Sequence, residues 1–275
     1  MKQVISIGRH LYERMQDADV FGLAAQLAYF FLLSLFPFLL FLITLLGYLP
    51  IDEQVLMDFI EMYAPAEIME LINTNISQLV QAQNGSLLSL GIIGTLWSAS
   101  NGVNAITKAI NRAYEVEEDR SFFIARLIAI IMTIAMIGVI AIAFLLPIFG
   151  EMIGVYIFSF FGLSDDFINV WNTLRWAISS IVFFIVLLAL YTLTPNVRIK
   201  VKNTLLGSLF ATISWQLVSL GFSYYVSTIG DYSATYGSLG AVIILMIWFY
   251  ISGIIIITGG VINAVIRSYA LLNKN

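Results

Sequence analysis

The chain has 275 residues, of which 60% are hydrophobic and 11% charged, and it contains no cysteine. Soluble domains usually carry about 25% charged residues, so this chain has too little charge to cover a surface that faces water. Several apolar runs reach the roughly 20 residues with which a helix crosses a bilayer. The composition therefore predicts a single all-α integral membrane domain over residues 1–275, without disulfides or cysteine-bound metals.

The predicted elements begin with an amphipathic helix within residues 1–19, which suits the cytoplasmic membrane surface. The first span covers residues 20–49, and residues 50–86 are predicted to form an external hairpin of amphipathic helices. Five more spans follow at residues 87–106, 127–149, 174–193, 205–229 and 241–266. The second span is the most polar of the six and must be shielded from lipid.

The distribution of charge gives the expected orientation of these spans. When loops alternate between the two sides, all but one of the 13 basic residues fall on the side of the termini, and the exception is Arg175. The other side receives mostly acids, namely Asp52, Glu53, Asp58, Glu61, Glu67, Glu70, Glu151, Asp165, Asp166 and Asp231. Because cytoplasmic loops are enriched in Lys and Arg, both termini are predicted to be cytoplasmic, in a bacterial plasma membrane.

Side chains suited to catalysis are few. The only histidine, His10, lies in the N-terminal amphipathic segment, away from the predicted spans. A histidine metal cluster or a nucleophile–histidine–acid system within the bundle is therefore excluded. The carboxylates lie in loops, which leaves no acid–base pair in the middle of a span. We expect a protein that is not an enzyme, with no catalytic residues, no metal and no cofactor.

Polar side chains recur at helical spacing within several predicted spans. These candidate groove residues are Gln26, Trp97, Asn101, Asn104, Lys108, Asn111, Gln216, Ser219 and Asn263. If their faces converge, they line a hydrated path for a polar headgroup or solute, because unpaired amides are costly in hydrocarbon. The alternative is that they join helices by hydrogen bonds, which such residues commonly do in membranes.

The segment from Asn111 to Arg126 is rich in charge and is predicted to be cytoplasmic. Its arginines are candidates for binding anionic headgroups, and they are Arg112, Arg120 and Arg126. The alternative is a solvated charged loop, since exposed ion pairs are common and individually weak.

Several ordered motifs over nearly the whole chain carry a family resemblance. They are Ala25-Gln26-Leu27-Ala28-Tyr29, Ser34-Leu35-Phe36-Pro37, Trp97-Ser98-Ala99-Ser100-Asn101-Gly102 and Tyr236-Gly237-Ser238-Leu239-Gly240. With these the chain resembles the YihY/BrkB family of bacterial inner-membrane proteins, which implies six spans. The family has also carried the label ribonuclease BN, but this sequence has neither a metal-ligand cluster nor a basic RNA-binding surface. Val261 follows Gly259-Gly260, where many members of the family have a glutamate, which argues against a proton-coupled carboxylate at that position.

Two classes of function follow from these patterns. The leading hypothesis is a transporter or flippase-like protein for a lipid or another amphiphile, motivated by the polar faces and the amphipathic segments. The alternative is an envelope scaffold whose external hairpin binds a partner. The expected partners are membrane lipids and a second copy of the chain, and nucleic acid is not among them.

Overall fold

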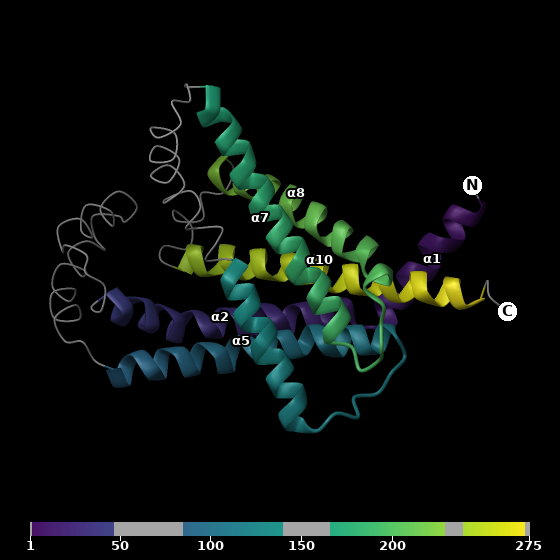
Figure 1. Cartoon of the computed structure of the whole chain (residues 1–275), viewed down its shortest axis with the longest axis horizontal. Coiled ribbons are helices and arrows are strands. Elements are labelled where there is room, and N and C mark those ends of the chain that lie inside the picture. The colour runs from purple at the N-terminus through teal and green to yellow at the C-terminus, as the bar shows by residue number, and fades with distance from the viewer. Residues whose placement is uncertain (1, 47–84, 140–165, 229–238, 273–275) are drawn as a thin grey trace. The chain divides into compact units, whose positions relative to one another are not determined.

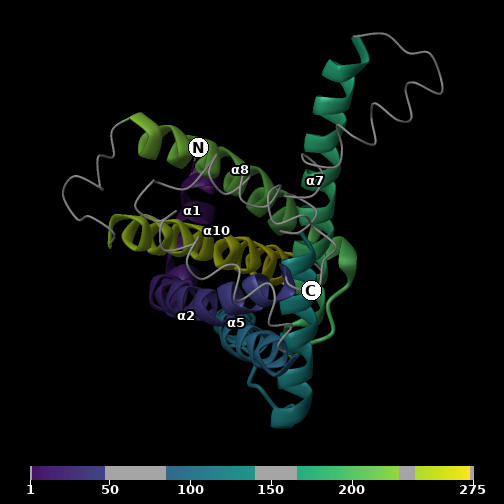
Figure 2. The ribbon, with the colours of Figure 1, turned by 90° about the vertical axis from the view of Figure 1, so that its left-hand side faces the viewer.

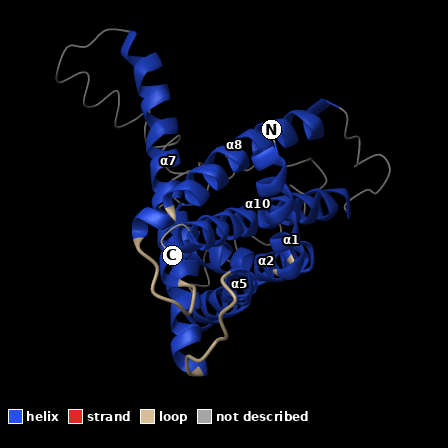
Figure 3. Cartoon of the chain, turned by 90° about the vertical axis from the view of Figure 1, so that its right-hand side faces the viewer, coloured by secondary structure: helices blue, strands red, loops and turns tan. Residues whose placement is uncertain are grey.

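The computed structural model describes residues 2–46, 85–139, 166–228 and 239–272, which Figure 1 draws in colour. The described residues form helices joined by short turns and loops, and no strand occurs among them (Figure 3). The longer helices are α1 (Lys2–Asp17), α2 (Val20–Leu46), α5 (Gly85–Ala113), α7 (Asp166–Leu193), α8 (Leu205–Thr228) and α10 (Leu239–Leu272). A short 3-10 helix, η1 (Val201–Asn203), precedes α8, and a further helical segment is Phe122–Val139. The predicted hairpin of residues 50–86 lies outside the described residues, apart from its last two residues, which belong to α5.

Among the described residues, five segments are long and apolar enough to cross a membrane. They are Val20–Phe41, Phe122–Val139, Trp176–Leu193, Leu205–Val226 and Val242–Ser268. Five of the six predicted spans overlap these segments, although the ends of the spans predicted at 20–49 and 127–149 lie outside the described residues. The prediction of a membrane protein is thus confirmed, and the part of the chain that the structure describes is helical. The remaining predicted span, residues 87–106, lies within α5 and is absent from this set because its serines and asparagines lower its hydropathy. At 1.5 Å per residue, the 29 residues of α5 extend over about 43 Å.

The chain divides into two compact units, residues 31–99 and the remainder, and each is described by itself. In the smaller unit, parts of α2 and α5 approach closely through glycines. A Cβ on Gly91 would lie 2.8 Å from the backbone of Phe41, and one on Gly94 would lie 3.0 Å from Pro37. Small residues permit this approach, as they do at many helix interfaces in membranes.

The larger unit is built on α10, along which α8 packs, with α7 against α8 (Figure 2). Glycine again allows close approach: a Cβ on Gly259 would lie 2.7 Å from the Gly207 carbonyl oxygen. The buried Tyr191 of α7 donates its hydroxyl to the Ile256 carbonyl, at 2.5 Å. These contacts join α7, α8 and α10, whose buried side chains include Leu187, Leu190, Ala211 and Ile257.

Helix α1 packs against α10 and is joined to the end of α5 by two ion pairs. Arg14 pairs with Glu115, and Asp19 accepts from Arg112 at 3.4 Å. Asp19 and Glu115 have φ angles of 53° and 56°, and they are the two non-glycine residues with positive φ among the described residues. This backbone region is costly for residues with a Cβ. Both strained residues thus supply the carboxylates of the ion pairs that hold α1.

Candidate functional site

Several helix ends of the larger unit meet at one place. Near the end of α5, the Asn111 side-chain oxygen accepts a hydrogen bond from the backbone N–H of Asn196 at 2.8 Å, and Asn196 follows α7. Near the start of α8, Gly207 donates its N–H to Asn263 of α10, also at 2.8 Å. Basic side chains accumulate on these helix ends and on the chain between them, namely Arg112, Arg120, Arg198, Lys200, Lys202 and Arg267. We call this region the basic end.

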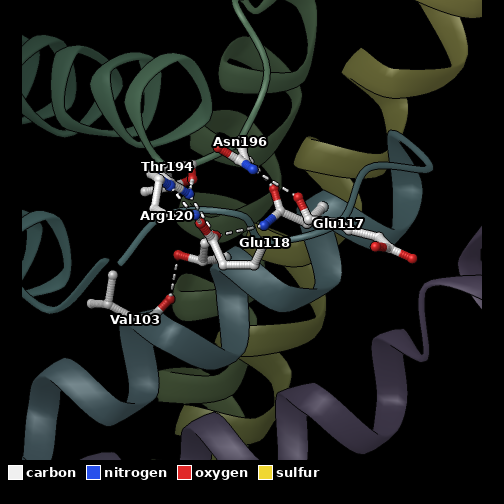
Figure 4. A network of polar contacts seen from close by, with 8 residues as sticks. Val103, Glu117, Glu118, Arg120, Thr194 and Asn196 are labelled. Carbon is white, nitrogen blue, oxygen red and sulfur yellow. Dashed lines mark hydrogen bonds and ion pairs between the residues drawn. The ribbon is translucent and has the colours of Figure 1, made fainter. Parts of the chain in front are cut away.

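At the basic end, a hydrogen-bonded cluster joins the segment after α5 to the residues that follow α7 (Figure 4). Arg120 binds both carboxylate oxygens of Glu118, at 2.6 and 2.7 Å, and also donates to the Thr194 carbonyl at 2.5 Å. Asn111 donates its side-chain amide to the same carboxylate at 2.9 Å, and Asn196 donates its amide to the Glu117 carbonyl at 2.7 Å. We call this set the Arg120 cluster.

The hydrogen bonds from Arg120 hold the pKa of the Glu118 carboxyl below its usual range, and the Asn111 amide adds to this effect. Glu118 therefore stays ionised at neutral pH and remains the acceptor that organises the cluster. Charge-assisted, bidentate pairs of this kind are short and directional. The Arg120 guanidinium is thus engaged by protein acceptors, and its predicted role in headgroup binding remains a prediction.

Arg126 is a buried cation near the start of the segment Phe122–Val139, which is long and apolar enough to cross a membrane, and 9% of its surface is exposed. Its guanidinium donates to the Asn101 side-chain oxygen of α5 at 2.6 Å. An ionised group at membrane depth is expensive to maintain and often marks a functional position. Two residues predicted to bind ligand, one for the groove and one for headgroups, therefore lie in direct contact.

Asn263 is fully buried between α10 and α8. Gly207, whose N–H donates to the Asn263 side-chain oxygen, lies in the first turn of α8, where backbone N–H groups have no partner within the helix. The Thr204 hydroxyl just before α8 donates to the Val201 carbonyl. Asn263 thus acts as an N-terminal cap supplied by a neighbouring helix, which favours the packing interpretation for this residue.

The other predicted groove residues are distributed over both units. Gln216 of α8 donates to Ser180 of α7 at 2.6 Å and so joins two helices. Trp97 belongs to the smaller unit and is exposed, as is Lys108 of the larger unit. Gln26, Asn104 and Ser219 are partly exposed. Asn111, Gln216 and Asn263 thus bind protein partners, and convergence of the whole set on one groove stays a prediction.

Sequence reasoning missed a pair at the basic end, formed by Tyr114 and Arg267. The Arg267 guanidinium carbon lies 5.6 Å from the centre of the Tyr114 ring. Arg267 is one of the basic residues that the sequence places on the side of the termini, but no periodicity relates it to Tyr114, which lies far away in the chain. In the described part of the chain, no group of three or more His, Asp or Glu side chains gathers to hold a metal ion.

Comparison with known proteins places this architecture in a family. Residues 11–274 match the family described as virulence factor BrkB. The chain is 51% identical over 263 residues to the "putative ribonuclease-like protein YfkH" of Bacillus subtilis, a match that covers 96% of each chain. It is 29% identical to a "UPF0761 membrane protein" of Photobacterium profundum, over 96% of this chain and 82% of that protein. No solved structure matches. The chain therefore belongs to the BrkB family.

Proposed function

We propose that this protein crosses the bacterial plasma membrane six times, with both termini in the cytoplasm, and moves an anionic lipid or another amphiphile between the leaflets. The sixth crossing is α5, whose length suffices and whose polar residues Thr95, Ser100 and Asn111 are buried, while Asn101 contacts Arg126. The basic end faces the cytoplasm in this proposal, since Lys and Arg are retained on that side.

The main observation in support of transport is the contact between the buried Arg126 and Asn101. Its charge lies within an apolar helix, next to α5, the helix with the most polar residues of the proposed crossings. A phosphate-bearing headgroup that leaves water needs a cation or donors on its path, because an isolated charge in hydrocarbon is strongly destabilised. Arg126 supplies a cation and Asn101 an amide. Arg112 lies on α5, as Asn101 does, and in this proposal it is closer to the cytoplasm. No catalytic step belongs to this proposal.

The topology is tested with single cysteines on either side of α5. The chain has no native cysteine, so each variant carries one reactive thiol. Ser86 is the second residue of α5, Ser121 lies eight residues after the end of α5 at Ala113, and both are exposed. We expect a membrane-impermeant maleimide to label Ser86→Cys in intact cells and Ser121→Cys only after permeabilisation. Labelling of both from outside would contradict a crossing by α5.

Transport is tested by reconstituting the protein in liposomes with a fluorescent phosphatidylglycerol and following its exchange between leaflets by dithionite quenching. We expect Arg126→Gln to slow exchange about tenfold, the factor that corresponds to about 1.4 kcal/mol. Arg198→Gln, a change of an exposed cation between α7 and α8, is the matched control and should exchange as the wild type does. Wild-type protein no faster than empty liposomes, or a folded Arg126→Gln variant at full rate, would refute transport by this route.

A further inference from the structure

Tyr114 and Arg267 bring two unsatisfied donors together at the basic end. Tyr114 directly follows α5, and Arg267 lies in the last turns of α10. The Tyr114 hydroxyl and one terminal nitrogen of Arg267 are buried, and neither finds an acceptor in the described part of the chain. A buried donor without an acceptor is rare in folded proteins and calls for an explanation. Here two of them belong to side chains that touch each other.

Among the described charged residues around this pair, Arg267 is left without a carboxylate partner. Glu115, next to Tyr114, pairs with Arg14, and Asp19 pairs with Arg112. Both carboxylates at the junction of α1 and α5 are therefore engaged by other arginines. Arg267 makes no ion pair with a described carboxylate, while its ring contact with Tyr114 holds the guanidinium in place.

Both side chains are donors at neutral pH. Burial raises the pKa of the Tyr114 hydroxyl to about 12, against the opposing effect of the Arg267 charge. The phenol therefore remains protonated, and arginine is always charged. A group that satisfies both must be an acceptor and is favoured if it is negative. Phosphate oxygens meet both conditions, and guanidinium binds them with strong, charge-assisted hydrogen bonds.

We propose that Tyr114 and Arg267 form a binding site for the phosphate group of an anionic phospholipid. Arg267 lies next to the end of the apolar segment Val242–Ser268, where headgroups begin, and both side chains are partly exposed. The two unsatisfied donor atoms are themselves buried, so in this proposal the side chains turn outward when the phosphate binds. A bound phosphate accepts from the phenol and from the guanidinium and neutralises the surplus charge. The site needs insertion in the membrane but not transport, so it can fail or hold independently of the exchange measured above.

The experiment measures lipid binding to the purified full-length protein in nanodiscs of phosphatidylcholine into which phosphatidylglycerol is titrated. Bound lipid is counted by native mass spectrometry after release from the disc. We expect the wild type to retain phosphatidylglycerol about tenfold more strongly than phosphatidylcholine. Arg267→Gln should lose this preference, and Tyr114→Phe, which removes one oxygen and nothing else, should reduce it several-fold. Tyr12→Phe and Arg9→Gln change exposed residues of α1, outside the basic end, and should bind as the wild type does.

The Tyr114→Phe variant also keeps the proposal falsifiable if Arg267→Gln fails to fold. Without anionic lipid, removing the unsatisfied hydroxyl should leave the melting temperature unchanged or raise it, whereas added phosphatidylglycerol should stabilise the wild type more than the variant. Equal stabilisation of both would overturn the proposal. A further melting measurement adds inorganic phosphate to the protein in the absence of anionic lipid. A response in the wild type that Tyr114→Phe lacks would assign the same site to the free ion and overturn the lipid assignment.

Discussion

Replacing Gly207 with alanine is expected to separate α8 from α10 and to remove most of the folded protein. An added Cβ at this position would overlap the Gly259 carbonyl oxygen and lie 2.5 Å from the Asn263 amide carbon. Neither atom is the end of a flexible side chain that can move aside, because the first is backbone and the second is fully buried. The helices must then move apart, which also breaks the hydrogen bond between Gly207 and Asn263.

The expected loss combines overpacking, which costs about 1–3 kcal/mol or more, with a buried backbone donor left unpaired, which costs about 1–3 kcal/mol. The matched control is Gly221→Ala in the same helix, where a Cβ meets no described atom within 4 Å. Folded yield from size-exclusion chromatography in mild detergent, together with the melting temperature, separates the two variants. A Gly207→Ala protein as stable as Gly221→Ala would show that α8 and α10 do not pack as described.

Replacing Asn111 with alanine is expected to release the Arg120 cluster and expose the chain between α5 and the helix that begins at Phe122. Asn111 is buried and makes two hydrogen bonds, donating to Glu118 and accepting from Asn196. Its removal leaves the Asn196 N–H without its acceptor and weakens the position of the Glu118 carboxylate. We expect destabilisation of about 2–4 kcal/mol, since each unsatisfied group contributes about 1–3 kcal/mol and the effects of neighbouring groups are not strictly additive.

The measurement is limited proteolysis, because trypsin can cut after Arg120 only when that segment leaves α7. The control is Asn104→Ala, a partly exposed position two turns earlier on the same helix, which should be cut as slowly as the wild type. Equal cleavage of Asn111→Ala and the wild type would mean that the cluster does not hold this segment.

Most of the helices could be predicted because the physical signal is local. An apolar run long enough to span hydrocarbon is read directly from the sequence, and the predicted spans at 174–193 and 205–229 end close to Leu193 and Thr228. The span within α5 was the hardest to place. Its polar residues dilute its hydropathy, and the charge on either side, rather than its own composition, argued for it. The structure extends this helix to Ala113, beyond the predicted end at residue 106.

The candidate site could be predicted only in part. Arg126 was selected as an arginine of the charged segment before the third predicted span, and Asn101 as a polar residue within a predicted span, but nothing in the sequence indicated that they contact each other. Asn263 was selected by the same reasoning, and its role as a cap for α8 depends on how two helices lie side by side. The pair of Tyr114 and Arg267 was missed because no spacing in the sequence relates two positions on different helices so far apart in the chain.

The sequence by itself determined the class of protein, the approximate spans, the family and the uneven distribution of charge, because each depends on composition, run length or ordered motifs. The tertiary structure decided which polar groups meet: Arg120 with Glu118, Asn263 with Gly207, and Tyr114 with Arg267. The physical reason is that a hydrogen bond between helices depends on their rotation and separation to within about an ångström. Helical periodicity defines the face on which a residue lies, whereas close contacts such as that of Gly207 with Gly259 define what that face touches.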